Sequence, residues 1–263
     1  MGKKKKLLST FISAIAVSMV LAACGNDPKE SSSGDGSGAK EKLVAGTEAT
    51  FAPFESLDDN GKIVGIDVDT LNAIGKETGS QFEIKNIGWE PVFQQVTNGE
   101  IDLGASGITI TKERKETYDF TEPYFEATQL IVVKEGSKIK SLDDLKDKNI
   151  AVQINTTGHI AAKKLQGKSS SKIKAYENQP LAFQEVINGS VDAAIGDNAV
   201  VNEYLKNNPN SKLKTIEDSA FEKEYYGFMV KKGNKEVLDV LNKGLKKIKE
   251  NGKLAEITGQ ELK

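Results

Sequence analysis

Cysteine and histidine are nearly absent: the 263 residues include one of each. Zinc sites are usually built from several Cys or His ligands, so we expect no zinc site of that kind and no disulfide within the chain. A Ser-His-Asp triad needs an imidazole beside a nucleophilic serine. His159 instead follows Asn-Thr-Thr-Gly, with no elbow-like serine motif nearby. We therefore expect no metal, no cofactor and no catalytic residues.

Nucleotide-binding motifs and concentrated basic charge are also lacking. The sequence has no GxxxxGK[ST] phosphate loop and no GxGxxG fingerprint. Charged residues make up 28% and aromatics 6%, which is ordinary for a soluble globular domain. The formal net charge is −2, and removal of residues 1–23, with four lysines and no acids, would make it −6. Nucleic acid is excluded as an expected partner.

The one long apolar run is at the N-terminus. Lys3 to Lys6 precede an apolar stretch, 7–20, that is short for a membrane span. Leu-Ala-Ala then precedes Cys24, which resembles a bacterial lipobox; the alternative is an ordinary signal peptide with an incidental cysteine. We expect 1–23 to be a lipoprotein signal peptide, Cys24 to be lipid-modified, and 24–42 to be a flexible Ser/Gly-rich tether. The protein would be anchored on the extracellular face of a Gram-positive type cell membrane, or on its periplasmic side.

An internal repeat organises the remaining chain. Six residues recur at an offset of ninety: Phe93, Gln94, Val96, Asn98, Gly99 and Asp102 match Phe183, Gln184, Val186, Asn188, Gly189 and Asp192. In each copy a helix is predicted to end at Asn-Gly, and a short apolar run then suits a buried parallel strand. Ligands in open α/β sheets bind at the carboxyl ends of strands. Two similar lobes with one shared cleft are therefore predicted.

The other elements follow from periodicity and turn residues. Asp67 or Asp69 is expected to cap a helix that ends at Gly79, and Pro91 to open the helix that carries the first copy of the repeat. Lobe 1 is predicted to comprise 43–127 and 225–263, with lobe 2, 128–224, inserted and joined by two strands. The expected strands are 43–47, 82–87, 101–105, 129–134, 150–153, 173–176, 191–195 and 225–230, and one helix is expected over 236–257.

Candidate binding residues follow the predicted strand ends. Arg114 can grip a carboxylate with two parallel hydrogen bonds, while Asp197 can hold an ammonium group. Further donors come from the Ser106-Gly107 backbone, from Thr109, and from Thr156 and Thr157 at a helix N-terminus. Arg114 and Asp197 each have an alternative role: Arg114 could pair with Glu113 or Glu116 on a surface helix, and Asp197 could cap a helix. A different pair, Asp67 and Asp69, resembles the carboxylate pair of a glycosidase in spacing alone.

Five segments, 47–55, 65–69, 107–114, 118–124 and 192–197, together resemble the polar-amino-acid-binding lipoproteins of ABC importers (solute-binding family 3). The resemblance covers essentially all of 42–263, and its GITIT-x-x-R string is specific. It implies a type II periplasmic-binding-protein-like α/β fold, with two Rossmann-like lobes, a two-strand hinge and closure on a free L-amino acid. It also implies delivery to an ABC permease with separate ATPase subunits, action as a monomer, and no catalysis.

The resemblance further implies roles within the site. Arg114 and Thr109, helped by Thr157, would hold the α-carboxylate, while Asp197 and Ser106 would hold the α-ammonium. Phe51 and Trp89 would sandwich the ligand side chain, with Gln153 and Gly196 at variable pocket positions.

The sequence favours a basic substrate. Two π-faces suit a guanidinium, and Glu48 and Glu55 offer negative charge to its far end. The segments 86–90, 153–159 and 197–210 look most like the arginine/lysine/histidine-binding branch. A glutamine- or cystine-binding protein is the alternative within the family. A cyclohexadienyl dehydratase-like enzyme or a sensory module is the alternative of another class; the enzyme would need a general acid, and His159 is the only histidine.

Overall fold

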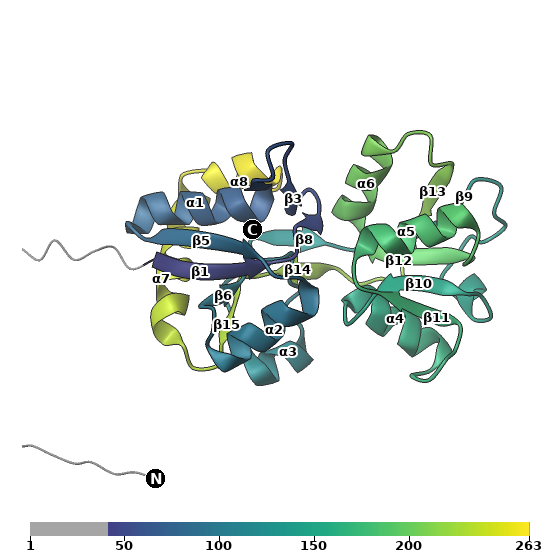
Figure 1. Ribbon diagram of the computed structural model, residues 1–263, viewed down its shortest axis with the longest axis horizontal. Coiled ribbons are helices and arrows are strands. Elements are labelled where there is room, and N and C mark those ends of the chain that lie inside the picture. Colours follow the sequence, from purple (N-terminus) through teal and green to yellow (C-terminus); the bar gives the residue numbers. More distant parts are fainter. Residues whose placement is uncertain (1–41, 263) are drawn as a thin grey trace, which may run out of the picture. The chain divides into compact units, whose positions relative to one another are not determined.

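The computed structural model describes residues 42–262, which contain two five-stranded sheets (Figure 1). In the first, the strand order is β5-β1-β6-β15-β7. β1 runs parallel to both β5 and β6, while β15 is antiparallel to β6 and β7. The bounds are β1 (Lys42–Thr47), β5 (Gln81–Asn86), β6 (Leu103–Gly104), β7 (Tyr118–Phe120) and β15 (Met229–Lys231).

The second sheet repeats this plan, with the order β11-β10-β12-β9-β13. β10 lies between two parallel neighbours, as β1 does in the first sheet, and β9 is antiparallel to β12 and β13. The internal repeat in the sequence therefore corresponds to a repeat in topology. The bounds are β9 (Gln129–Lys134), β10 (Ile150–Gln153), β11 (Ile173–Tyr176), β12 (Ala193–Asp197) and β13 (Leu213–Ile216).

Helices cover both sheets, with α1 and α8 above the first sheet in Figure 1 and α2 and α3 below it. As predicted, α2 and α5 both end at glycines in the left-handed region, Gly99 (φ 76°) and Gly189 (φ 78°). The bounds are α1 (Ile66–Thr78), α2 (Trp89–Asn98), α3 (Lys112–Thr117), α4 (Thr157–Gln166), α5 (Gln179–Asn188), α6 (Asn198–Asn207), α7 (Lys235–Glu250), α8 (Lys253–Thr258) and the 3-10 turn η1 (Asp143–Leu145).

Two antiparallel strands, β8 (Phe125–Ala127) and β14 (Glu224–Tyr226), join the two groups of elements. β8 leads through Thr128 into β9 of the second sheet, and β14 leads back toward β15 of the first. The predicted fold class, two α/β lobes with a two-strand hinge, is confirmed; the lobe boundaries stay a prediction. A small three-stranded sheet of β2 (Thr50–Phe51), β3 (Glu55–Leu57) and β4 (Ile63–Val64) follows β1.

Four predicted elements were wrong in extent. The strand expected over 101–105 is the shorter β6, and the strand expected over 191–195 begins and ends two residues later, as β12. The strand expected over 225–230 is divided between two sheets, because the Gly227 amide donates to the Ile108 carbonyl and the Phe228 amide to the Thr121 hydroxyl. The helix expected over 236–257 is broken at Gly252, which has a left-handed φ of 79°.

Two predicted helix starts were also wrong. Pro91 is the third residue of α2, whose first residue is Trp89. Neither Asp67 nor Asp69 caps α1, because Gly65 occupies the cap position without a side-chain hydrogen bond. In the part of the chain that the structure describes, no helix combines the length and apolarity needed to cross a membrane. The expected signal peptide, Cys24 and the tether up to residue 41 lie outside the described residues, whereas Lys42, predicted as the end of the tether, is the first residue of β1.

The two aspartates of the internal repeat, Asp102 and Asp192, make equivalent pairs of hydrogen bonds. Asp102 Oδ2 accepts the Val44 amide at 2.7 Å, and the Asp102 amide donates to the Val44 carbonyl at 2.9 Å. Asp192 makes the same reciprocal pair with Asn149, at 2.8 and 2.9 Å. Each aspartate thus joins the start of the strand that follows a helix, β6 or β12, to the start of its parallel neighbour, β1 or β10.

We predict that Asp102→Ala lowers the free energy of unfolding by about 1.5–3 kcal/mol, because it removes a charge-assisted hydrogen bond to a half-buried amide. Asp192→Ala should cost less, since Asp192 is exposed. Urea denaturation of both variants measures this, with exposed Glu100→Ala as the control. An Asp102→Ala variant as stable as the control would contradict the assignment.

Candidate functional site

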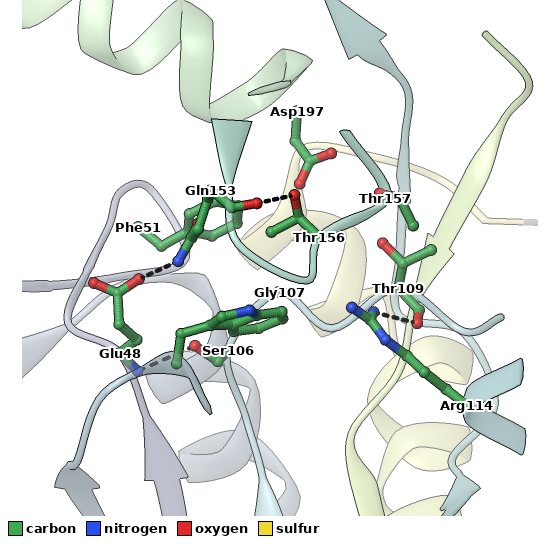
Figure 2. Close-up of a pocket in the computed structure, with 11 residues that line it drawn as sticks. Glu48, Phe51, Ser106, Gly107, Thr109, Arg114, Gln153, Thr156, Thr157 and Asp197 are labelled. Atoms are coloured by element: carbon green, nitrogen blue, oxygen red, sulfur yellow. Dashed lines mark hydrogen bonds between the residues drawn. The ribbon is translucent and has the colours of Figure 1, made fainter. Parts of the chain in front are cut away.

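One pocket lies at the carboxyl ends of strands from both sheets (Figure 2). Residues that follow β1 and β6 face residues at the ends of β10 and β12. The eleven residues predicted from the sequence all line it: Glu48, Phe51, Trp89, Ser106, Gly107, Thr109, Arg114, Gln153, Thr156, Thr157 and Asp197. Their convergence follows from the parallel strand topology of each lobe.

Arg114 lies on α3 with its guanidinium held from two sides. Nη1 donates to the Thr109 carbonyl at 2.8 Å, and Nη2 donates across the cleft to the Asn155 carbonyl at 3.0 Å. The guanidinium carbon lies 5.5 Å from the Trp89 ring centroid and 5.2 Å from that of Phe93. Burial lowers the pKa of Arg114 to about 10, which leaves it charged at neutral pH. These contacts replace the pairing with Glu113 or Glu116 considered as an alternative.

Glu48 follows β1 and connects the two lobes. Its Oε2 accepts a hydrogen bond from Gln153 Nε2 at 3.1 Å, and its Oε1 accepts one from the Thr50 hydroxyl (Figure 2 shows the Gln153 bond). Burial raises the pKa of Glu48 to about 7, although both hydrogen bonds lower it. The charge of this carboxyl therefore depends on pH near neutrality.

Two aromatic side chains form apolar walls of the pocket. Phe51 and Trp89 are 6% and 7% exposed, and Trp89 Nε1 donates across the cleft to the Ile154 carbonyl at 2.8 Å. Gly107 has a φ of 54°, and a Cβ there would lie 2.8 Å from the Phe51 ring. Only glycine fits between Phe51 and the chain at this turn. Phe54, by contrast, is wholly buried in the core.

Asp197 ends β12 and occupies the N-cap position of α6, but its side chain does not cap the helix. Its Oδ1 instead accepts a hydrogen bond from Gln129 Nε2. Burial and the negative charge of Glu224 raise the pKa of Asp197 to about 7. The Asp197 carboxylate therefore does not cap α6, the alternative considered above, and it lines the pocket.

The N-terminus of α4 faces the pocket through Thr156 and Thr157. The Thr156 hydroxyl accepts the His159 amide at 3.2 Å, and His159 Nδ1 accepts the Asn155 amide at 3.0 Å. The first-turn amides of a helix have no carbonyl partner within it, so those at Thr157 and Gly158 can bind an anion. His159 stabilises this turn and is not among the residues that line the pocket.

Two buried acids outside the pocket, Glu55 and Asp67, hydrogen-bond to residues that line it. Ser106 Oγ accepts the Glu48 amide at 3.1 Å and donates to Glu55 Oε1 at 2.8 Å. Asp67 accepts the Gly107 amide at 3.0 Å and the Tyr124 hydroxyl at 2.6 Å. Burial raises the pKa of Glu55 well above its ordinary value and that of Asp67 to about 6. Asp67 therefore positions the Gly107 turn and neither caps a helix nor pairs with Asp69.

Two residues expected near the ligand lie elsewhere. Glu55 is wholly buried and bonded to Ser106, so it does not face the far end of the pocket. Gly196 lies within β12, where a Cβ would meet the Gln179 amide at 2.6 Å, and it does not line the pocket.

Sequence reasoning missed Glu224 and Gln129, the first residues of β14 and β9. Glu224 Oε2 accepts hydrogen bonds from the hydroxyls of Thr109, at 3.0 Å, and Thr157, at 2.7 Å. Their positions offered a signal, because Gln129 begins the strand expected over 129–134 and Glu224 directly precedes the strand expected over 225–230, at the two connections between the predicted lobes. Among the described residues around the pocket, Arg114 is thus the one cation and Glu48, Asp197 and Glu224 are three acids. Such a site suits a ligand that carries net positive charge.

No cluster of three or more potential metal ligands occurs within residues 42–262. The chemistry available in the pocket is that of holding a charged molecule. A guanidinium and helix amides can bind an anion, and carboxylates at two separate places can each bind a cation.

Comparison with known proteins agrees with this architecture. Residues 43–261 match the family model of bacterial extracellular solute-binding proteins, family 3. A probable histidine-binding protein of Neisseria gonorrhoeae is 39% identical over 240 residues, 91% of this chain and 89% of the relative. The arginine-binding extracellular protein ArtP of Bacillus subtilis (strain 168) is 33% identical over 253 residues, 96% of each chain.

Among solved structures, the arginine-, lysine-, histidine-binding protein ArtJ from the thermophilic bacterium Geobacillus stearothermophilus is similar over 85% of this chain and 97% of its own. The TM-score is 0.80 and the sequence identity 51%. Both the resemblance noted in the sequence and the expectation of a binding protein in place of an enzyme are confirmed. The match over nearly all described residues shows that the chain belongs to the bacterial extracellular solute-binding proteins, family 3.

Proposed function

We propose that this protein captures a free basic L-amino acid, arginine, lysine or histidine, outside the cytoplasm and delivers it to an ABC permease that separate ATPase subunits drive. The observation that carries this proposal is the pocket itself, where Arg114 and three carboxylates converge from both lobes. The same substrate class is supported by the similar proteins, which are a probable histidine-binding protein, an arginine-binding protein and an arginine-, lysine-, histidine-binding protein.

Arg114 and Asp197, which lie close enough for their charges to influence each other, suit the two charged groups on the α-carbon of an amino acid. Arg114 and the first amides of α4 would hold the α-carboxylate, because both present N–H donors to an anion. Asp197, with the Ser106 oxygen, would hold the α-ammonium. These groups come from both lobes, so a ligand contacts all of them only in the closed form, and its binding stabilises that form.

The far end of the pocket suits a cationic side chain. Phe51 and Trp89 offer flat faces for a guanidinium or imidazolium, a contact worth roughly 0.5–2 kcal/mol. Glu48 supplies the opposite charge and is held in place by Gln153. A glutamine- or cystine-binding protein remains the alternative, in which the Gln153 amide would serve a neutral ligand. Calorimetric titration with the twenty amino acids tests the proposal, and a response to glutamine alone would overturn the basic substrate.

We further propose that Cys24 carries a lipid that anchors the protein to the outer face of the cell membrane, with 24–42 as a tether and the binding lobes acting as a monomer. The small residues before the sole cysteine support this proposal. Lipidation anchors a chain without a spanning helix.

Arg114→Ala should weaken the binding of every amino acid by about 2–5 kcal/mol, because the carboxylate loses its cationic partner. Calorimetry measures the affinity, and thermal unfolding without ligand verifies the fold. Arg114→Lys keeps the charge but loses the paired donors, so it should retain part of the affinity. Unchanged binding by Arg114→Ala would remove the carboxylate role.

Affinity for arginine should fall as the pH falls through about 7, since the Glu48 carboxyl becomes neutral there and no longer attracts the cationic side chain. The slope should approach about tenfold per pH unit for this one proton. Asp197 also has a pKa of about 7, so its protonation as the pH falls lowers the affinity for every amino acid over the same pH range. The steeper fall for arginine than for glutamine therefore isolates the effect of Glu48.

The matched control is Glu48→Gln, which should remove the extra pH dependence and weaken basic ligands selectively. Equal losses for arginine and glutamine would contradict the role given to Glu48. Calorimetry at pH values on both sides of 7 supplies each comparison.

Cys24→Ser should move the protein from the membrane fraction to the medium or periplasm without changing its affinity for the amino acid, because the anchor is remote from the lobes. Fractionation followed by immunoblotting measures the distribution. Retention of the variant in the membrane fraction would contradict the anchor.

A further inference from the structure

The hydroxyl groups of Thr109 and Thr157 line the pocket, and both donate to the same oxygen, Glu224 Oε2. A hydroxyl has one proton and two lone pairs. Once its proton is committed to Glu224, each threonine can offer only an oxygen acceptor to a ligand. Neither hydroxyl is then a donor to the α-carboxylate, the role that the family resemblance gave to Thr109.

Gln129 fixes the direction of this network. Its Nε2 donates to Thr157 Oγ1 at 3.1 Å and also to Asp197. An ionised Asp197 can only accept, so the amide nitrogen must face it, and the Thr157 oxygen then receives the second amide hydrogen. Thr157 therefore has its proton left for Glu224. Glu224 and Gln129 begin the two strands β14 and β9, at the connection between the lobes.

We infer that Glu224 is a positioning residue for the ammonium end of the pocket. By accepting both hydroxyl protons, it turns the lone pairs of Thr109 and Thr157 toward the space beside Asp197. An ammonium group carries three donors and no acceptor, so it needs several acceptors around it. Asp197, the two threonine oxygens and Ser106 supply such a set. This inference rests on the proposed binding of an amino acid, but it does not depend on which side chain that amino acid has.

Glu224 also adds a negative charge behind the hydroxyls, and the half-buried carboxyl lies close enough to Arg114 and Asp197 for the charges to influence one another. Charge alone would attract any cationic ligand without regard to the threonines. Orientation of the hydroxyls by Glu224 and simple attraction by its charge therefore predict different results when the Thr109 hydroxyl is removed.

The test is a double-mutant cycle with Glu224→Met and Thr109→Val, measured by calorimetric titration of L-arginine. Thr109→Val should weaken binding about tenfold in the native background, because it removes an acceptor of the ammonium. In the Glu224→Met background the same change should cost less than about threefold, since the hydroxyl no longer presents its lone pairs. Equal factors in both backgrounds would overturn the positioning role and leave only charge.

Two further variants separate this result from a structural defect. Glu224→Gln keeps an oxygen acceptor without the charge, so it should bind more tightly than Glu224→Met; equal losses would contradict the acceptor role. Glu222→Gln, an exposed acid on the same segment, should bind like the native protein, and thermal unfolding of each variant without ligand checks folding. If the native protein binds glutamine and not arginine, the basic-substrate proposal fails. The same cycle with glutamine then decides the role of Glu224.

Discussion

Among the described residues around the cleft there are three carboxyl groups, of Glu48, Asp197 and Glu224, and one guanidinium, and this charge imbalance governs how the site can work. Burial of Glu48 and Asp197 raises the pKa of each to about 7, because an ionised carboxylate without a cationic partner is costly in a low-dielectric setting. A ligand with two positive groups and one negative group supplies the positive charge that these cleft residues lack. The same contacts that bind it would then also draw the lobes together.

The supporting residues matter as much as those that line the pocket. The Gly107 turn is held by Asp67, Ser106 is oriented by Glu55, and the two threonine hydroxyls are turned by Glu224. Each of these acids is placed so that a polar group of the pocket has its hydrogen bond to protein already made. In this arrangement the direction of the groups that remain for a ligand is therefore set by hydrogen bonds within the protein.

The sequence predicted the parallel strands of both large sheets and the residues that line the pocket, because parallel strands bring their carboxyl ends to one edge. It did not predict β7 or β13, which are edge strands of these sheets. It did not predict the partners of Asp67. An acid at the start of a helix has the pattern of a cap, whereas Gly107 and Tyr124 lie 40 and 57 residues away. Hydrogen bonds between such distant residues leave no local pattern. Glu224 was missed for a similar reason, since its threonine partners belong to two other segments.

Two residues that orient polar groups of the pocket lie at the hinge between the lobes. Glu224 and Gln129 begin strands on either side of the connection between the sheets, and their hydrogen bonds reach Thr109 of one lobe and Thr157 and Asp197 of the other. An acid on a hinge strand that contacts hydroxyls from both lobes links the relative position of the lobes to the hydrogen-bond direction inside the pocket. Separation of the lobes would break at least one of the two hydroxyl bonds to Glu224. The acceptors for an ammonium group would therefore be complete only in the closed form, so that capture and closure are one event.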